Sequence, residues 1–321
     1  MKKRICVIGG GRWGENHIRT LHGMDCLAAI VEPDRDKLTK LLMQYPVKGY
    51  QEPEAAIKNS YDGFILATPA ETHYPLGKIL LSQGQNVLIE KPMALTSRHS
   101  AKLVEIAAKS GSRLMVGHLL LFHPAIRKIK ELTSRGKIGR LYYVYSNRLN
   151  LGVVRTQENV FWSFAPHDIS VIDYLVGARP IAIEAKGAKF LQDEIYDVTM
   201  TQFTYPGNIH AHIYVSWLHP FKEQRLVLIG SKGMISFDDS SVEKNILYYS
   251  KCIEWADGKP IKIEHPDEIV AYDKKLPLNE ELQYFIDNLD GKIEIASGQT
   301  GHEVVMVLET VQGLIAKTRE I

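Results

Sequence analysis

Short apolar runs alternate with amphipathic stretches along the first third of the chain. The runs are apolar at nearly every position, which is typical of parallel strands covered on both faces. They occupy residues 3–8, 27–31, 62–67, 86–89 and 113–117. The stretches between them carry apolar residues at helical spacing and occupy residues 17–21, 34–44, 73–83 and 97–109. This alternation predicts an α/β domain with a doubly wound parallel sheet over residues 1–119.

A different pattern begins after about residue 120. Residues 140–151 alternate, with Tyr143 and Tyr145 on one face and Val144 and Ser146 on the other. Further segments with strand character cover residues 181–189, 196–204, 209–217, 223–229 and 233–237. Helices are expected over residues 123–135, 167–176, 278–290 and 301–318. The sequence therefore predicts a second, α+β domain over residues 120–321, built on an open, mainly antiparallel sheet.

Composition and charge exclude several classes of function. The chain has 321 residues, 45% hydrophobic and 24% charged, which suits two ordinary globular domains. A formal net charge of +2, with Lys and Arg spread along the chain, argues against a nucleic-acid surface. No segment approaches the roughly 20 apolar residues of a membrane span, and the first apolar run is too short for a signal peptide. The three cysteines form no CxxC pair, so we expect a cytoplasmic protein with reduced thiols and no metal site.

A glycine-rich turn follows the first expected strand. Gly9, Gly11 and Gly14 form a GxGxxG pattern between the strand and a helix, with Arg12 and Trp13 inside it. In this context the first glycine permits a tight turn, and the second lets the backbone approach a pyrophosphate. The third lets the helix pack close to the strand, and the helix N-terminus adds N–H groups and a positive dipole end. The motif predicts a dinucleotide site.

An acidic residue at the end of the second strand bears on the choice of dinucleotide. Glu32 lies 18 residues after Gly14, where a carboxylate accepts hydrogen bonds from the adenosine ribose and repels a 2′-phosphate. Pro33 follows it, and Arg35 is a basic residue close by. We therefore expect NAD as the cofactor, with NADP less favoured.

Three more motifs complete a pattern along the chain. They are Ala67-Thr68-Pro69 followed by His73, then Glu90-Lys91-Pro92, and later Pro166-His167-Asp168. Together with the glycine turn and Gly230-Ser231-Lys232-Gly233, they make nearly the full chain resemble the Gfo/Idh/MocA oxidoreductase family.

The resemblance implies roles for these residues. Thr68, Pro69 and His73 would line the cofactor channel, beside the motif Glu90-Lys91-Pro92. Lys91 would contact the nicotinamide region and the reacting hydroxyl, and His167 would be its catalytic partner. The second domain would bind the substrate and, through its exposed sheet, join the subunits of a homodimer or homotetramer.

The chemistry of alcohol oxidation fits Lys91 and His167. Hydride loss from a secondary alcohol requires the hydroxyl proton to leave as the carbonyl forms. Lys91 follows a parallel strand, at the edge where open α/β sheets place ligands, and a lysine there can share a proton or stabilise an alkoxide. His167 suits proton exchange near neutral pH. Many family members carry an aspartate four residues before this histidine, but Ser163 stands there, so we expect a catalytic core of two residues.

The segment from Arg148 to Asp168 resembles the branch of the family that oxidises C3 of nucleotide-linked amino sugars such as UDP-N-acetylglucosamine. Arg148 and Arg155 could bind a diphosphate, which a guanidinium fork suits better than an ammonium group. Asn159 and Trp162 could address the sugar face. We therefore expect a nucleotide-sugar substrate. The residues expected in its site are Arg148, Arg155, Asn159, Trp162 and Asp168.

Two alternatives stay open from the sequence. One is a dehydrogenase of the same family that acts on a free sugar or polyol such as inositol, and whose site needs neither Arg148 nor Arg155. The other is a protein that binds NAD or NADH as a signal without catalysis, for which Lys91→Ala would change nothing. Ordinary charge on the surface of a sheet also explains the two arginines.

Overall fold

The computed structural model describes residues 2–317, and residue 318 of the last expected helix lies outside them. Two compact units are present: Met1–Phe122 with Lys275–Met306, and His123–Lys274 with Val307–Ile321. The boundary after Phe122 lies close to the expected one at residue 119. In one respect the division differs, because the segment Lys275–Met306 returns to the first unit.

Close packing against the strand Leu114–Gly117 explains that return. The backbone N–H of Val116 donates to the carbonyl of Ala296. Glycines then let the following helix approach, since a Cβ on Gly298 would lie 2.6 Å from Leu114 and one on Gly301 would lie 2.4 Å from Val116. The apolar pattern near residue 300 predicted a helix, but pattern alone does not say which sheet that helix covers.

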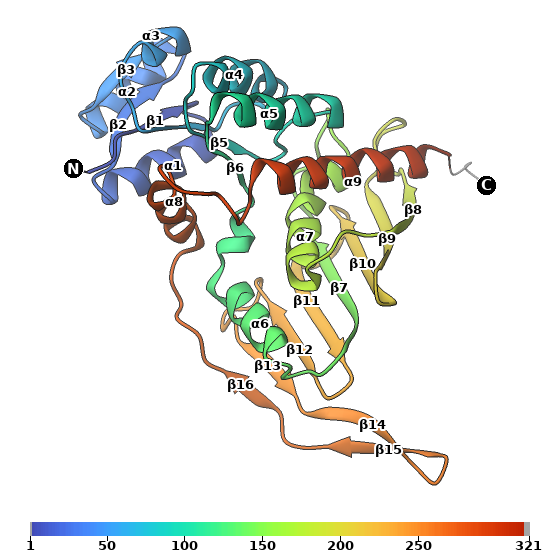
Figure 1. Cartoon of the computed structure of the whole chain (residues 1–321). Coiled ribbons are helices and arrows are strands. Elements are labelled where there is room, and N and C mark those ends of the chain that lie inside the picture. Colours follow the sequence, from blue (N-terminus) through green and yellow to red (C-terminus); the bar gives the residue numbers. More distant parts are fainter. Residues whose placement is uncertain (1, 318–321) are drawn as a thin grey trace. The chain divides into compact units, whose positions relative to one another are not determined.

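A six-stranded parallel sheet forms the first unit, with the strand order β3-β2-β1-β4-β5-β6 (Figure 1). The strands are β1 Ile5–Ile8, β2 Leu27–Val31, β3 Lys48–Tyr50, β4 Gly63–Leu66, β5 Val87–Glu90 and β6 Leu114–Gly117. The chain winds outward from β1 to one side and from β4 to the other, which places a ligand crevice at the carboxyl ends of these two strands. The predicted doubly wound parallel sheet is confirmed.

Helices accompany this sheet, and β1, β4, β5 and β6 are buried at every position. The helices of the first half are α1 Arg12–Gly23, α2 Arg35–Gln44, α3 Pro53–Ile57, α4 Ala70–Ser82, α5 Ser97–Ser110 and the 3-10 helix η1 Leu119–Phe122. From the end of the chain come α8 Pro277–Asp287 and, up to Met306, the first part of α9 Gly298–Lys317. The short edge strand β3 was not anticipated, because only three residues form it and none is fully buried.

An eight-stranded sheet forms the second unit, in the order β16-β13-β12-β11-β7-β10-β9-β8. Its strands are β7 Leu141–Leu149, β8 Ala182–Ala188, β9 Val198–Tyr205, β10 Ile209–Ser216, β11 Glu223–Gly230, β12 Met234–Asp238, β13 Ile246–Tyr249 and β16 Glu268–Val270. Only β7 and β10 run parallel to each other, so the predicted mainly antiparallel sheet is confirmed. The helix α6 Pro124–Ser134 also belongs to this unit, and α7 Val160–Val176 packs against β7, β9 and β10.

The helix α7 corrects the prediction of a helix over residues 167–176. It begins seven residues earlier, at Val160, because the side chain of Asn159 accepts hydrogen bonds from the backbone N–H groups of Phe161 and Trp162. Pro166 was taken to precede the helix, yet it lies inside it. His167 therefore sits within α7 and not at its first turn.

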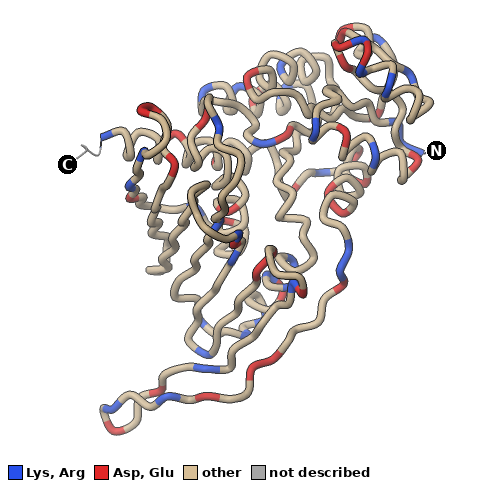
Figure 2. The backbone as a smooth tube through the Cα atoms, turned by 180° about the vertical axis from the view of Figure 1, so that it is seen from behind, with Lys and Arg blue, Asp and Glu red and all other residues tan. Residues whose placement is uncertain are grey.

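A two-stranded hairpin of β14 Lys251–Ala256 and β15 Lys259–Glu264 stands apart from the eight-stranded sheet (Figure 1). The sequence prediction missed it, although Asp257-Gly258 is a strong hairpin signal and both residues have positive φ. Its strands carry both lysine and glutamate, and acidic and basic positions are interspersed through both units (Figure 2). No described helix is long and apolar enough to cross a membrane.

The contact between Gly14 and Gly9 gives a test of the first unit. A Cβ on Gly14 would lie 1.9 Å from the carbonyl oxygen of Gly9, so Gly14→Ala must displace α1 from β1. We expect it to lower the free energy of unfolding by at least about 2 kcal/mol, the usual scale of overpacking. Gly313→Ala in α9 is the matched control, because nothing lies within 4 Å of that Cβ; it should stabilise by up to about 1 kcal/mol. Urea denaturation followed by circular dichroism measures both, and similar effects of the two variants would contradict this account.

Candidate functional site

The glycine turn between β1 and α1 leaves an open backbone cradle. Gly9 has φ +101°, and a Cβ there would lie 2.6 Å from the carbonyl oxygen of Ala67. Around Gly11, in contrast, nothing lies within 4 Å of the Cβ position. Gly11 is also the N-cap residue of α1, and none of the described side chains caps that helix. The N-terminus of α1 thus presents N–H groups and a positive dipole end to open space, which suits a pyrophosphate.

A cavity of about 630 Å³ continues from this cradle along the carboxyl ends of the strands in the first unit. Its volume and its mixture of backbone, apolar and charged lining fit a dinucleotide. Seven of the predicted cofactor residues line it: Gly9, Gly11, Arg12, Trp13, Glu32, Thr68 and Pro69. The other predicted cofactor residues do not line it: Gly14, His73, Glu90, Lys91 and Pro92.

Glu32 helps to build the cradle. Its side chain is 8% exposed; Oε2 accepts a hydrogen bond of 2.8 Å from the N–H of Gly10, and Oε1 accepts one of 3.1 Å from Asp34. Each carboxylate oxygen can accept a second hydrogen bond, so both can still receive ribose hydroxyls. Lys37 lines the same cavity with Nζ 3.9 Å from Oε2. Arg35 was the basic neighbour expected from the sequence. Lys37 was not anticipated, although it lies in the first turn of α2, where its N–H donates to the capping residue Asp34.

His73 joins two loops at the edge of the sheet. One ring nitrogen lies 2.8 Å from the carbonyl oxygen of Pro92, and the other lies 2.9 Å from that of Thr68. Both nitrogens can donate only in the imidazolium form, yet burial lowers the pKa of His73 and the two carbonyls offset this only in part. His73 therefore fixes the loop after β4 to the loop after β5, and it is itself 1% exposed.

The motif Glu90-Lys91-Pro92 follows β5 at the carboxyl edge of the sheet. Glu90 is buried and accepts hydrogen bonds from Trp13 Nε1 and from His17 Nε2, the latter of 2.7 Å. Its other oxygen accepts from the N–H of Lys91 at 3.1 Å. The side chain of Lys91 is partly exposed. Glu90 thus ties α1 to the residue on which the proposed chemistry depends.

A buried ion pair holds two of the predicted substrate residues in the second unit. Arg148 donates from Nε and from an Nη to the two oxygens of Asp168, at 2.8 and 3.0 Å. Ser146 donates to the same carboxylate at 2.6 Å, and both members of the pair are largely shielded from solvent. Such a bidentate pair engages both oxygens of the carboxylate and two of the five N–H donors of the guanidinium. It joins β7 to α7, which gives Arg148 and Asp168 a structural partner that the sequence did not reveal.

The remaining predicted residues of this unit differ in availability. Asn159 is buried; its oxygen caps α7 and its amide nitrogen donates to Gln312. Trp162 and His167 are partly exposed on α7, while Ser163 is buried. The side chain of Arg155 is 55% exposed, with Nε 3.8 Å from Glu158. Arg155 is therefore more accessible to an anion than Arg148.

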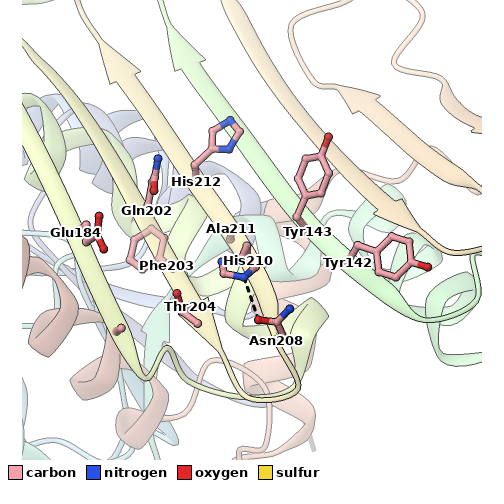
Figure 3. Close-up of a pocket in the computed structure, with 11 residues that line it drawn as sticks. Tyr142, Tyr143, Glu184, Gln202, Phe203, Thr204, Asn208, His210, Ala211 and His212 are labelled. Atoms are coloured by element: carbon pink, nitrogen blue, oxygen red, sulfur yellow. Dashed lines mark hydrogen bonds between the residues drawn. The ribbon is translucent and has the colours of Figure 1, made fainter.

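The face of the eight-stranded sheet carries a second hollow, of about 610 Å³. Figure 3 shows side chains from β7, β8, β9 and β10 projecting from the same face of the sheet. They include Tyr142 and Tyr143, each 41% exposed, and His210, which contacts Asn208. No group of three or more His, Cys, Asp or Glu side chains suited to a metal ion occurs within residues 2–317.

Two family models match the chain. The NAD-binding Rossmann fold of the Gfo/Idh/MocA oxidoreductases matches residues 3–118, and the C-terminal domain of the same family matches residues 126–236. The chain belongs to the Gfo/Idh/MocA family. Its first unit is accordingly an NAD-binding Rossmann domain, and the open cradle at Gly11 with Glu32 beside it fits that cofactor.

Named relatives of the chain act on different sugars and polyols. Inositol 2-dehydrogenase from Corynebacterium glutamicum is 27% identical over 194 residues, which is 58% of each chain. UDP-N-acetylglucosamine 3-dehydrogenase from Acidithiobacillus ferrooxidans is 24% identical over 192 residues, or 60% of each. These alignments cover less than two thirds of the length of the curated relatives. The solved structure of the second enzyme covers 98% of each chain with a TM-score of 0.86 at 21% identity, which shows a shared fold.

Glu32 and Lys37 offer a paired test of cofactor choice. Glu32→Ala removes the ribose acceptor and loosens the cradle, so NADH affinity should fall about tenfold, the scale of a lost hydrogen bond to a charged group. NADPH affinity should fall less, because the repulsion of its 2′-phosphate is removed at the same time. Lys37→Ala should do the reverse and weaken NADPH more than NADH. Fluorescence titration with both nucleotides gives the ratios; equal losses in Glu32→Ala would remove Glu32 from the discrimination.

Proposed function

We propose that this chain is an NAD-dependent dehydrogenase that oxidises a secondary hydroxyl group, at C3 of a nucleotide-linked amino sugar such as UDP-N-acetylglucosamine. The main observation in support of a dehydrogenase is the cofactor cavity of the first unit. Lys91 follows the neighbouring strand β5 at the same edge of the sheet. Membership in an oxidoreductase family supports it. The nucleotide-sugar substrate rests on the similarity to UDP-N-acetylglucosamine 3-dehydrogenase and on the exposed Arg155.

Lys91 is the proposed acceptor of the hydroxyl proton. Bound NAD would supply the hydride acceptor, and the alcohol becomes a carbonyl only if its proton leaves at the same time. The charge of Lys91 is coupled to the buried carboxylate of Glu90, which also receives the N–H of Lys91. Glu90 thereby orients the loop and balances the ammonium group that forms when the proton arrives.

His167 is the proposed second catalytic residue. It lies within α7, where it is partly exposed while Ser163, one turn earlier, is buried. The serine cannot supply the carboxylate that many family members carry at this position, so the proposed contribution of α7 to the chemistry is the imidazole of His167. An imidazole exchanges protons near neutral pH, which suits a group that polarises the hydroxyl or stabilises the developing carbonyl oxygen.

For the substrate, Arg155 and Trp162 are the proposed contacts. Arg148 and Asp168 satisfy each other and would support the site by holding α7 on β7. Asn159 has both ends of its amide engaged within the protein. A free polyol such as inositol is the second candidate, since inositol 2-dehydrogenases are among the relatives, and it would not need Arg155. Binding of NAD without catalysis is a remote third.

We also propose that the chain forms a homodimer or homotetramer through the face of the eight-stranded sheet. The half-exposed Tyr142 and Tyr143 and the hollow beside them support this (Figure 3). Aromatic side chains of this kind are enriched in interfaces between proteins.

The role of Lys91 leads to a direct test. Lys91→Ala should lower turnover of UDP-N-acetylglucosamine at least about a hundredfold, the scale of a lost proton-transfer group. NADH binding should persist, because Lys91 does not line the cofactor cavity. Steady-state kinetics and a parallel NADH titration separate the two effects. Near-normal turnover would exclude Lys91 from the mechanism, and unchanged NADH binding without any turnover in the unaltered protein would favour the sensing role.

The role of Arg155 tests the substrate class. Calorimetric titration of the NADH-bound protein should show saturable binding of UDP-N-acetylglucosamine and none of free N-acetylglucosamine. Arg155→Ala should weaken that binding by at least about tenfold, because a charge-assisted hydrogen bond to phosphate is lost. Arg135→Ala is the matched control, since Arg135 is another exposed arginine paired with a glutamate on its own helical turn. Binding of inositol in place of the nucleotide sugar would move the assignment to the polyol dehydrogenases.

A further inference from the structure

Four buried ionisable side chains meet in the first unit. This group, the Glu90 cluster, comprises His17 of α1, Glu90 of β5, His118 after β6 and Glu281 of α8. The carboxylate of Glu90 contacts His17, and its negative charge acts on both His118 and Glu281. The packing of α8 on α1 and η1 brings Glu281 into this group. Residues far apart in the sequence therefore share one electrostatic environment.

Glu90 is the charged member of the cluster. Burial raises its pKa, but the hydrogen bonds from His17 and Trp13 and the charge of Lys91 together outweigh burial, so its pKa is lowered. Gly117, its neighbour in β6, leaves no spare room, because a Cβ there would lie 2.8 Å from Oε2. The carboxylate of Glu90 thus accepts hydrogen bonds from three donors and belongs to the residue next to Lys91 in the chain.

Glu281 is in the opposite situation. It is 0% exposed, and neither of its carboxyl oxygens meets a hydrogen-bond partner among residues 2–317. Burial, and after it the negative charge of Glu90, raise its pKa well above the usual value. An unpaired buried carboxylate is costly, whereas the protonated acid is far less so. The charge on Glu281 is therefore governed by burial and by the negative charge of Glu90, and not by a hydrogen bond.

His118 is a further neutral member. It is 1% exposed with no partner at either ring nitrogen among the described residues. Burial lowers its pKa to about 4, against the opposing charge of Glu90. The charge of Lys91 also acts on His118, which shows that Lys91 and the cluster influence one another.

We propose that Glu281 is a positioning residue that acts through Glu90 and sets the pH at which Lys91 gains and loses the substrate's proton. This inference rests on the proposed function, in which Lys91 accepts that proton. While Glu281 is neutral, the cluster presents one negative charge to Lys91. Once Glu281 ionises, a second negative charge stabilises the ammonium form and makes Lys91 a stronger base, which keeps its proton up to a higher pH. The two groups titrate as a coupled pair.

The other ionisable groups near Glu281 do not replace it in this role. They are Glu90, whose charge acts on Glu281, His17 of α1 and His118 beside η1, which belong to the part of the fold that α8 packs on, and Tyr284 on α8 itself. Tyr284 has its hydroxyl engaged by the N–H groups of Glu294 and Ile295. Glu281 is thus the second carboxyl group of the cluster, and the one without a protein partner among the described residues.

Glu281→Gln separates this role from a structural one. We would follow the 13Cε signal of Lys91 in lysine-labelled, NAD-saturated protein, assigned by comparison with Lys91→Arg, across pH 6 to 11. Removing the second negative charge should lower the midpoint of the Lys91 titration by on the order of one pH unit. The acid limb of kcat/KM for UDP-N-acetylglucosamine should move in the same direction.

Stability supplies the second readout. The folded pKa of Glu281 is raised, so its favourable contribution is present below the unfolded value near 4.5 and is lost as the pH rises. Glu281→Gln should therefore melt at the same temperature as the unaltered protein near pH 4.5 and at a higher temperature at pH 8. Asp173→Asn is the matched control, because burial raises the pKa of Asp173 to about 7 in the second unit. It should change the pH dependence of melting without moving the Lys91 midpoint.

The outcomes are distinct. A Lys91 midpoint that is unchanged in Glu281→Gln would overturn the inference, whether or not melting changes. A shift of equal size in Asp173→Asn would also overturn it, because the effect would then be global. If Lys91→Ala retains turnover, the proposed function of Lys91 is wrong, and this inference fails with it. If Lys91→Ala is inactive while the Lys91 midpoint is unchanged in Glu281→Gln, only this inference fails.

Discussion

The buried carboxylate of Glu90 is the interaction on which the first unit depends most. It ends β5 and collects hydrogen bonds from Trp13 and His17 of α1 and from the backbone of Lys91. A single acceptor thereby fixes the helix that follows the glycine turn, the loop that carries the proposed base and the cofactor cavity lined by Trp13. Charge-assisted hydrogen bonds of this kind are strong when desolvated, and removing Glu90 would take the acceptor away from all three donors at once.

Much of the architecture could be predicted from the sequence, because it is encoded locally. Continuous apolar runs such as the one at residues 87–89 are typical of buried parallel strands, and a glycine turn of this pattern between a strand and a helix is typical of a dinucleotide site. The edge strand Lys48–Tyr50 and the hairpin from Lys251 to Glu264 escaped notice. The edge strand is short, and none of these strands has a fully buried position. Their sequences therefore lack the apolar pattern that predicts a strand.

The site was less predictable, because its contacts join residues that are distant in the sequence. Nothing local shows that Arg148 pairs with Asp168, since that depends on β7 lying beneath α7. Asn159 looks equally suited to a sugar or to a helix cap, and only its geometry shows that it caps α7. Lys37 lines the cofactor cavity because the first turn of α2 lies beside it. Glu281 belongs to the same unit as Glu90 because the segment Lys275–Met306 folds back onto the first unit. Residue types suggested the chemistry, whereas tertiary packing decided which of them are available.

The indole of Trp13 lines the cofactor cavity while its N–H is held by a carboxylate. Reduced nicotinamide absorbs at the wavelengths at which tryptophan emits, so a bound dinucleotide would draw excitation energy from this ring. Trp217, in contrast, is wholly buried in the second unit and bonded to Asp197. The chain therefore carries an intrinsic optical reporter of cofactor occupancy, in a ring whose N–H is hydrogen-bonded to Glu90.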